Sequence, residues 1–343
     1  MKLGVKQIIN REICHFADKN LLITSKYNKI YIKKKDVDEF TILLPQKGWK
    51  RLFAPFRLTR RALRLDKCNV VSVENGFVGI RQGKVFHYNE NTRQLQITLH
   101  LTNCRNVLHQ SIAVINKKHI YFGEYGNNAS REAVPVYRSI DCGQNWEVIY
   151  SFPPKKIKHV HGCYHDPYED KIWTVTGDFE NECHILCADY DFNHIEWIGD
   201  GQQMYRTCRL IFQENSIHWI MDSPLQDSYH VVLDRKTRKA YKRQLFQGPV
   251  WYTKKLDDNY YLAATAQEIG PGVKDHLVHF MVSRDLEKWK DIYQFVHDGY
   301  PKRYFKFGVI SFADGNQDSH SFYMFAEAIK GFDGNIVECE ILE

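Results

Sequence analysis

Short runs of alternating apolar and polar residues follow one another along most of the chain, a pattern typical of half-buried β-strands. Residues 136–150 (Val-Tyr-Arg-Ser-Ile-Asp-Cys-Gly-Gln-Asn-Trp-Glu-Val-Ile-Tyr) show this alternation on both sides of a turn, which predicts a β-hairpin. Aromatic residues make up 14% of the chain and favour strands, because flat side chains suit a pleated surface. Long stretches with a helical period are hard to find. The pattern therefore predicts an all-β fold.

The turn inside this hairpin, residues 139–146, has the form Ser-x-Asp-x-Gly-x-x-Trp. Each of the four specified residues in this turn has a local physical role. The Ser139 and Asp141 side chains can accept hydrogen bonds from turn amides, and Gly143 can adopt a positive φ. Trp146 is large enough to fill the gap between neighbouring strands.

Weaker copies of the turn recur along the sequence, at residues 35–40, 188–197, 233–241 and 282–289. Their aromatic anchors, with a weaker equivalent near Leu95, are Phe40, Trp146, Trp197, Tyr241 and Trp289. A spacing of about fifty residues is that of one four-stranded propeller blade, and the chain length then accommodates about seven blades. We expect a single domain, residues 1–343, folded as a seven-bladed β-propeller of four-stranded blades.

Individual strands follow from the same alternation. Three of the predicted blades contain residues 158–164, 171–176, 183–188 and 196–198; residues 207–212, 216–221, 229–233 and 241–245; and residues 307–312, 321–327 and 335–341. The last blade lacks a strand, and residues 5–9 are expected to supply it. The ring is then closed by an N-terminal strand, which removes an exposed sheet edge.

The turn motif and its period resemble the Asp box of the bacterial neuraminidase repeat superfamily, which includes sialidases and other propellers that act on glycans. This resemblance implies activity on a sugar, with Asp boxes at the blade periphery. In sialidases a glutamate activates a tyrosine nucleophile, as Glu124 and Tyr125 could, and three arginines bind the substrate carboxylate. Here Arg64 and Arg206 match that use, with Arg303 as the third. The Arg-Ile-Pro motif of sialidases is missing, and residues 56–58 (Phe-Arg-Leu) replace it poorly.

Polar residues gather where the first two strands of successive predicted blades reach the same face. The first-strand positions are Arg64, His109, His159, His161, Arg206 and Tyr252, and the second-strand positions are Glu124, Tyr125, Asp178, Glu182, Asp222, Glu268 and Glu327. Propeller topology brings such positions around one central pit. We therefore expect His159, His161, Glu124, Asp178 and Arg206 to line a single pit.

Catalytic roles are predicted for His159, His161, Glu124, Tyr125 and Asp178, because imidazoles and carboxylates transfer protons. The remaining residues, together with Tyr205, are predicted to bind substrate. On a strand His159 and His161 point the same way, so a divalent metal at these two residues stays open as an alternative, although no cofactor is predicted. Packing of both histidines at a blade interface is the third interpretation.

The composition limits which binding partners and which cellular location are expected. The net charge is +6, and basic residues cluster at 33–35 and 50–64, yet no nucleic-acid-binding motif is present, which disfavours nucleic acid as the partner. Nine cysteines without a CxxC pair and an N-terminus without a leader pattern predict reduced thiols and a cytoplasmic location. No apolar run reaches the roughly eighteen residues that cross a membrane, so no membrane partner is expected.

Two functional hypotheses follow. The first is a carbohydrate-active enzyme that cleaves an acidic or anionic glycan linkage, as a glycoside hydrolase or a polysaccharide lyase, with an acidic oligosaccharide or polysaccharide as its partner. The second is a non-catalytic propeller scaffold that binds a glycan or a protein.

Overall fold

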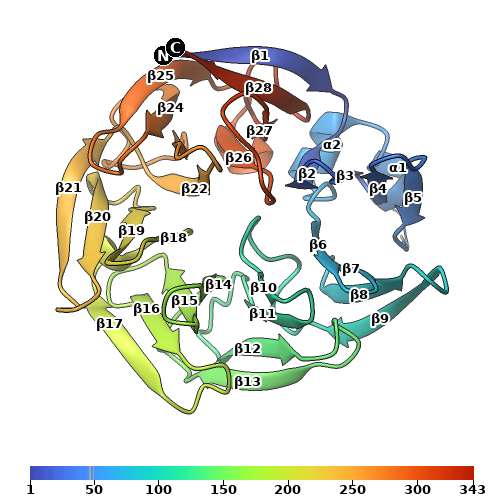
Figure 1. The fold of residues 1–343 in the computed structure, drawn as a ribbon, viewed down its shortest axis with the longest axis horizontal. Coiled ribbons are helices and arrows are strands. Elements are labelled where there is room, and N and C mark those ends of the chain that lie inside the picture. The colour runs from blue at the N-terminus through green and yellow to red at the C-terminus, as the bar shows by residue number, and fades with distance from the viewer. Residues whose placement is uncertain (46–47, 49) are drawn as a thin grey trace. The chain divides into compact units, whose positions relative to one another are not determined.

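Nearly all regular structure in the protein is β-strand. The computed structural model describes residues 1–45, 48 and 50–343. Within this part of the chain the strands form seven four-stranded antiparallel sheets (Figure 1). The predicted fold class, an all-β, seven-bladed β-propeller of four-stranded blades, is confirmed. No helix among the described residues is long and apolar enough to cross a membrane.

The chain forms two compact units. Unit 2 comprises Cys68–Ser223 and Tyr229–Arg243. Its first two sheets are formed by β6 (Asn69–Val73), β7 (Gly76–Arg81), β8 (Lys84–Asn89) and β9 (Gln94–His100), and by β10 (Ala113–Ile115), β11 (His119–Gly123), β12 (Val134–Ser139) and β13 (Glu147–Phe152).

Unit 2 continues with the sheet that later provides the candidate site. The third sheet consists of β14 (His159–Asp166), β15 (Lys171–Gly177), β16 (Cys183–Ala188) and β17 (Ile195–Gly201), and the fourth of β18 (Ile211–Phe212), β19 (Ser216–Ile220), β20 (Ser228–Asp234) and β21 (Ala240–Phe246). The first residue of β20 and the last three residues of β21 are assigned to unit 1. A short 3-10 turn, η1 (Gln203–Tyr205), joins the two sheets.

Unit 1 holds the other three sheets. They are β2 (Ile13–Ala17), β3 (Leu21–Lys26), β4 (Lys29–Lys34) and β5 (Phe40–Leu43); β22 (Val250–Lys255), β23 (Tyr261–Thr265), β24 (Leu277–Ser283) and β25 (Lys290–Val296); and β26 (Val309–Phe312), β27 (Phe322–Glu327), β28 (Ile336–Leu342) and β1 (Lys2–Ile9). β1 pairs with β28 from Lys2 opposite Leu342 to Ile9 opposite Ile336, so the N-terminal strand completes the last sheet as predicted.

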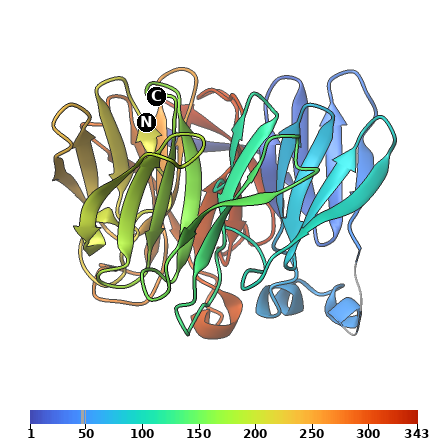
Figure 2. The ribbon, with the colours of Figure 1, turned by 90° about the horizontal axis from the view of Figure 1, so that it is seen from below.

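Three short helices belong to unit 1: α1 (Lys50–Phe53), α2 (Arg57–Ala62) and α3 (Lys302–Phe305). Figure 2 shows α1 and α2 (blue) and α3 (red) beyond one end of the strands of their unit. The basic cluster at residues 50–64 thus contains α1 and α2. Residues 50 and 51 of α1 are described by their backbone alone.

The predicted strand boundaries agree closely with the observed ones, with one exception. The first strand of the β18–β21 sheet was expected from residue 207, but its ladder begins at Ile211. The Thr207 hydroxyl instead donates to the carbonyl oxygens of Arg209 and Ile220, and Asp222 N donates to Arg206 O. These contacts replace regular ladder pairing just before β18.

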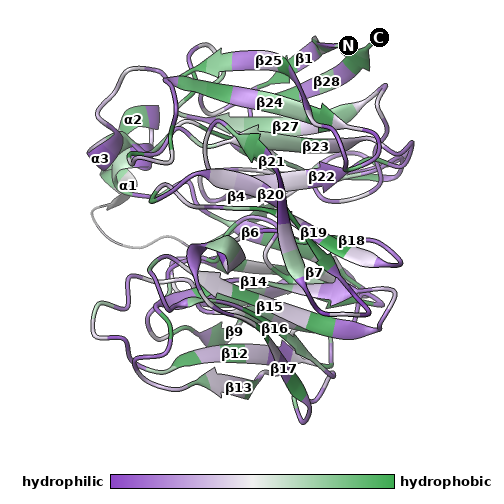
Figure 3. Cartoon of the chain, turned by 90° about the vertical axis from the view of Figure 1, so that its left-hand side faces the viewer, coloured by the Kyte–Doolittle hydropathy of each residue, from purple (hydrophilic) through white to green (hydrophobic). Residues whose placement is uncertain are grey.

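Sheet packing in unit 2 depends on large buried side chains. Trp173 on β15 and Trp219 on β19 are completely buried and belong to one apolar cluster, which joins the β14–β17 and β18–β21 sheets. Hydrophobic colouring in Figure 3 lies mainly on the strands, and many connecting loops are hydrophilic. All nine cysteines are buried and free of disulfide bonds.

The turn between β12 and β13 has the predicted chemistry. Asp141 Oδ1 accepts hydrogen bonds from the backbone N–H groups of Gln144 (3.1 Å) and Asn145 (2.9 Å). Ser139 Oγ accepts from Gly143 N, and Gly143 has a φ of +84°. The Trp146 indole packs edge-on against Phe122 and donates to Thr98 Oγ1 on β9, the outer strand of the preceding sheet. The tryptophan therefore spans two sheets.

Candidate functional site

His159 and His161 lie at the start of β14, where the strand is irregular. The pairing register with β15 shifts between Val160 and Gly162, so His161 is the extra residue of a β-bulge. A bulge redirects the side chain that it carries. The two imidazole centroids are 5.1 Å apart, and only 3% of His159 and 1% of His161 is exposed.

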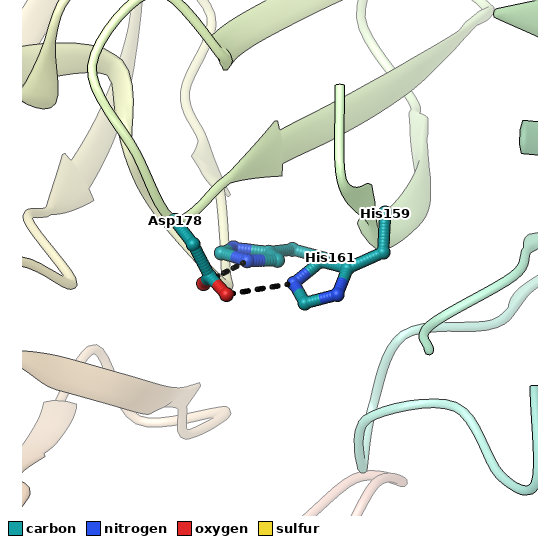
Figure 4. Close-up of side chains that lie close together, drawn as sticks. All are labelled: His159, His161 and Asp178. Atoms are coloured by element: carbon teal, nitrogen blue, oxygen red, sulfur yellow. Dashed lines mark hydrogen bonds and ion pairs between the residues drawn. The ribbon is translucent and has the colours of Figure 1, made fainter. Parts of the chain in front are cut away.

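Asp178 receives both imidazoles. It follows the last residue of β15 and has a φ of +129°, a strained conformation that costs on the order of 1–3 kcal/mol. His159 Nε2 lies 3.4 Å from Oδ2 and His161 Nε2 lies 3.3 Å from Oδ1, as Figure 4 shows. A Cβ on the preceding residue, Gly177, would lie 2.8 Å from His161 Cε1, so glycine leaves the space that the ring occupies.

Two cations complete the cluster. Lys158 Nζ lies 2.6 Å from Asp178 Oδ2, and Arg206 Nη2 lies 3.3 Å from Oδ1. Arg206 also donates through Nη1 to the carbonyl oxygen of Asp178, and its Nε lies 3.4 Å from Asp222 Oδ2. The two basic residues therefore balance the two carboxylates in charge. We call Lys158, His159, His161, Asp178, Arg206 and Asp222 the Asp178 cluster.

Burial and the neighbouring charges have opposite effects on the pKa values of Asp178 and His159. Burial opposes the charged form of Asp178, but interactions with His159 and His161 outweigh it and hold the pKa of this carboxyl well below its ordinary value. Burial lowers the pKa of His159, and the attraction of Asp178 offsets this only in part. Asp178 is therefore ionised and His159 is neutral near pH 7.

Each imidazole is fixed by a backbone carbonyl on the side away from Asp178. His159 Nδ1 lies 2.7 Å from Gly126 O, and His161 Nδ1 lies 3.0 Å from Thr207 O. The Tyr125 ring lies over His159, with 4.1 Å between centroids. The phenol predicted to be catalytic is thus beside the cluster.

Two overlapping groups of side chains have the donor atoms and spacing for a metal ion. One consists of His159, His161 and Asp178, and the other of His161, Cys208 and Asp222. In the second group the Cys208 thiol donates to Asp222 Oδ2 at 3.1 Å. Burial, reinforced by Asp222, raises the pKa of this thiol well above its ordinary value, which disfavours the thiolate that binds metals.

Glu124, predicted to be catalytic, has a carboxylate that is hydrogen-bonded outside the Asp178 cluster. Its Oε1 accepts from Thr102 N and from the Tyr137 hydroxyl, and its Oε2 accepts from Asn103 N. Both carboxylate oxygens are therefore bound to the loop after β9 and to β12. Glu124 organises this loop, and the contacts of its side chain lie outside the Asp178 cluster.

Other predicted substrate-binding residues of unit 2 are also engaged elsewhere. Glu182 forms an ion pair with Arg131 at 2.7 Å. The Tyr205 ring packs on Trp219 in the apolar core, and burial raises the pKa of its hydroxyl. His109 is half-buried in the loop between β9 and β10. Asp222 alone of these acidic and aromatic candidates shares Arg206 with Asp178.

Four predicted residues belong to unit 1. Arg64 is exposed directly after α2, whereas Tyr252 is a buried core residue of β22 rather than a binding residue. Glu268 accepts a hydrogen bond from the Trp251 indole at 2.7 Å. Glu327 forms ion pairs with Lys306 and Lys67, and although burial opposes its charged form, Lys306, Lys67 and Arg57 together hold its pKa well below the ordinary value.

The arginines near α2 bind internal carboxylates. Arg57 forms ion pairs with Glu12 (3.3 Å), Asp66 (2.8 Å) and Asp333 (3.0 Å), and the buried Arg61 pairs with Asp298 and Asp333. A substrate carboxylate would have to displace these partners. Arg303 on α3 is exposed and lies over the Tyr304 ring.

Two residues in or beside the Asp178 cluster were not predicted from the sequence. Lys158, the first residue of the predicted strand 158–164, was given no functional role, although it directly precedes His159 and is a charge at the start of an inner strand. Cys208, which contacts His161 Nδ1 at 3.4 Å, has no local signal, because a buried thiol in a strand is ordinarily a core residue.

Comparisons with known proteins show the fold and nothing narrower. No protein family and no curated protein matches the sequence. Among solved structures, oligogalacturonate lyase from Vibrio parahaemolyticus is 9% identical, with a TM-score of 0.59 over 99% of this chain and 92% of the lyase. The extracellular domain of a one-component system from B. thetaiotaomicron is 9% identical, with a TM-score of 0.58 over 98% of this chain.

This chain spans 39% of that one-component-system chain. A dihydro-heme d1 dehydrogenase is 12% identical, with a TM-score of 0.52 over 92% of this chain and 60% of the dehydrogenase. The functions named for these three proteins differ from one another. At such low sequence identities the similarity extends to the architecture alone. The chain is a seven-bladed β-propeller whose polar cluster at the start of β14 is its candidate functional site.

Proposed function

We propose that the protein is a carbohydrate-active enzyme that cleaves an acidic or anionic glycan linkage at the Asp178 cluster. The observation that carries the proposal is the convergence of two imidazoles and two cations on one carboxylate. Perturbed ionisation and backbone strain at the same residue, Asp178, are features of functional sites.

The cations suit an acidic sugar. The partly exposed Lys158 presents a positive charge to a carboxylate or sulfate, and Arg206, buried between Asp178 and Asp222, adds to the positive potential of the cluster. The Tyr125 ring packs against His159 in a tilted arrangement, so this phenol lies beside the cluster. Imidazoles whose Nε2 atoms face one carboxylate are suited to accept a proton or to hold a cation.

Elimination fits the cluster better than hydrolysis. Hydrolysis uses two carboxyl groups on either side of the scissile bond, but Glu124 is bound to a loop, and Asp222 is buried and shares Arg206 with Asp178. Elimination needs a neutralised uronate and a group beside it that removes a proton, and the cluster has cations together with imidazoles and the neighbouring Tyr125 phenol. The architecture shared with oligogalacturonate lyase is in keeping with this reaction class.

The Asp-box assignment remains part of this proposal. The turn at Asp141 and the turn at Asp285, whose Oδ1 accepts from Glu287 N and Lys288 N, have the hydrogen bonds that the motif requires. Both turns lie between the outer two strands of a sheet, so they support a structural use of the motif.

Incubation with uronate-containing, sialylated and sulfated oligosaccharides tests the proposed activity. New reducing ends accompany either reaction, and the ultraviolet absorbance of an unsaturated uronate marks elimination. We expect cleavage of a uronate substrate, and His161→Ala or Asp178→Ala should abolish turnover with the fold intact by circular dichroism. The exposed His194 provides the control, because His194→Ala should retain full activity.

Saturable glycan binding without new reducing ends would instead support the non-catalytic scaffold. Turnover that survives both Asp178→Ala and His161→Ala would show that the reaction occurs elsewhere in the molecule.

A further inference from the structure

The tautomers of His159 and His161 follow from their backbone contacts. A carbonyl oxygen can only accept a hydrogen bond, so the close approach of His159 Nδ1 to Gly126 O (2.7 Å) places a hydrogen on Nδ1. The same holds for His161 Nδ1 and Thr207 O at 3.0 Å. A neutral imidazole carries one hydrogen. In both residues the Nε2 atom is therefore the one with a lone pair.

These two lone pairs face a carboxylate. His159 Nε2 is 3.4 Å from Asp178 Oδ2, in an orientation that makes no hydrogen bond within the described residues. His161 Nε2 is 3.3 Å from Oδ1, a contact that is a hydrogen bond only when this nitrogen carries the hydrogen. A nitrogen lone pair and a carboxylate oxygen repel unless positive charge lies between them.

We propose that His159 Nε2, His161 Nε2 and the Asp178 carboxylate bind one divalent transition-metal cation, of the class of Zn²⁺ or Mn²⁺. Their ligand atoms all lie within 4.8 Å of one another. Two imidazoles and one carboxylate are suited to such cations, whereas Ca²⁺ and Mg²⁺ prefer sites made only of oxygen. The hydrogen bonds from both Nδ1 atoms to backbone carbonyls are those that orient metal-binding histidines.

The β-bulge and the neighbouring glycine are what make the three donors converge. The bulge places His161 beside His159, and Gly177 leaves room for the His161 ring next to Asp178. The second group of donors is a weaker site, because it needs His161 Nδ1, already bound to Thr207 O, and a Cys208 thiol that donates to Asp222.

The charge balance connects the metal to the substrate. Lys158, Arg206, Asp178 and Asp222 sum to zero, so a divalent cation adds two positive charges that an acidic glycan would offset. Metal and acidic glycan should therefore each increase the affinity for the other. This coupling rests on the proposed function, whereas the binding of the metal alone does not.

Calorimetric titration of the full chain, stripped with a chelator, with Zn²⁺, Mn²⁺ or Co²⁺ tests the site. One cation should bind per chain, and Co²⁺ should produce visible absorption bands of nitrogen and oxygen ligation. His161→Ala and the isosteric Asp178→Asn should each weaken binding by more than about 100-fold, the upper end of the effect of changes outside the ligand set. Melting temperatures measured without metal report whether each variant folds.

The matched control is His194→Ala, which removes an exposed imidazole that contacts the Asp189 carboxylate and should leave the affinity unchanged. Equal affinity in wild type and Asp178→Asn, or the absence of bound metal in folded wild type, would overturn the proposal. Neither result involves a glycan, so failure of the metal site and failure of the proposed activity are separable. Tight metal binding without any glycan cleavage would leave the metal site standing and refute the activity.

Discussion

Asp141 holds the turn between β12 and β13 through its Oδ1 contacts with the backbone of Gln144 and Asn145. These contacts also lower the pKa of the carboxyl against the opposing effect of burial, which shows that they favour the ionised form. Asp141→Ala should lower the free energy of unfolding by on the order of 1 kcal/mol or more. Thermal denaturation measures the change, and glycan and metal binding should survive in the folded fraction. Substitution of the exposed Glu214 by alanine is the control, and a binding defect with an unchanged melting temperature would contradict this structural role.

Gly177 permits the close approach of His161 and Arg206 to Asp178. A Cβ there would lie 2.8 Å from His161 Cε1 and 3.0 Å from Arg206 Cγ. Gly177→Ala should therefore displace the buried ring and weaken metal affinity by roughly 10-fold to 100-fold, as changes around a ligand set do. The contrasting substitution is Gly248→Ala, whose Cβ would meet nothing closer than 3.5 Å. Titration with Zn²⁺ compares the two variants, and equal affinities would show that the site tolerates this displacement.

At the scale of secondary-structure elements, β19 and β20 are joined by a buried histidine pair. His218 Nδ1 and His230 Nε2 are 3.0 Å apart, and burial lowers the pKa of His218 to about 4 and that of His230 to about 3. Below the ordinary value of 6.5 the unfolded chain takes up protons while the folded chain does not. Stability should therefore fall as the pH decreases from 6.5 towards 4, by up to about 1.4 kcal/mol per pH unit for each imidazole.

Urea denaturation at about pH 7 and about pH 5 measures this loss. The double substitution His218→Leu and His230→Leu removes both titrating groups, so it should flatten the acid side of the stability profile even if it changes stability at neutral pH. An unchanged slope in that variant would assign the acid sensitivity to other groups.

At the scale of the whole molecule, β1 covers the edge of β28 over nearly its full length. Deletion of residues 1–9 would leave the backbone groups of β28 without their partner strand, and exposed strand edges associate with one another. The deletion should lower the free energy of unfolding by on the order of 3–5 kcal/mol, the sum of several net hydrogen bonds, and should cause concentration-dependent self-association. Denaturation and light scattering measure both effects. Removal of Glu343 alone, which follows β28, is the control, and a stable, monomeric deletion variant would show that β1 is dispensable.

The local pattern of the sequence was enough to predict the strands, the turn at Asp141 and the pairing of the N-terminal strand with the last sheet. The strands and the turn depend on the two-residue period of a strand and on side-chain contacts within a few residues, which consecutive positions specify. The pairing of the N-terminal strand followed from the repeat, because the last predicted blade lacked one of its four strands. The sequence also indicated that His159 and His161 lie at the start of a strand and Asp178 at the end of the next one, but the bulge at His161, rather than the two-residue period, brings both imidazoles to Asp178.

Tertiary structure alone decided which of the polar strand ends converge. Glu124 had the same sequence signal as Asp178, but a loop from the preceding sheet takes both of its carboxylate oxygens. Tyr252 was expected to bind substrate and is buried in a core, while Lys158, for which no role was predicted, reaches Asp178. A strand end fixes where a Cα lies, whereas the partner that a side chain reaches depends on bulges, glycines and loops contributed by distant parts of the chain.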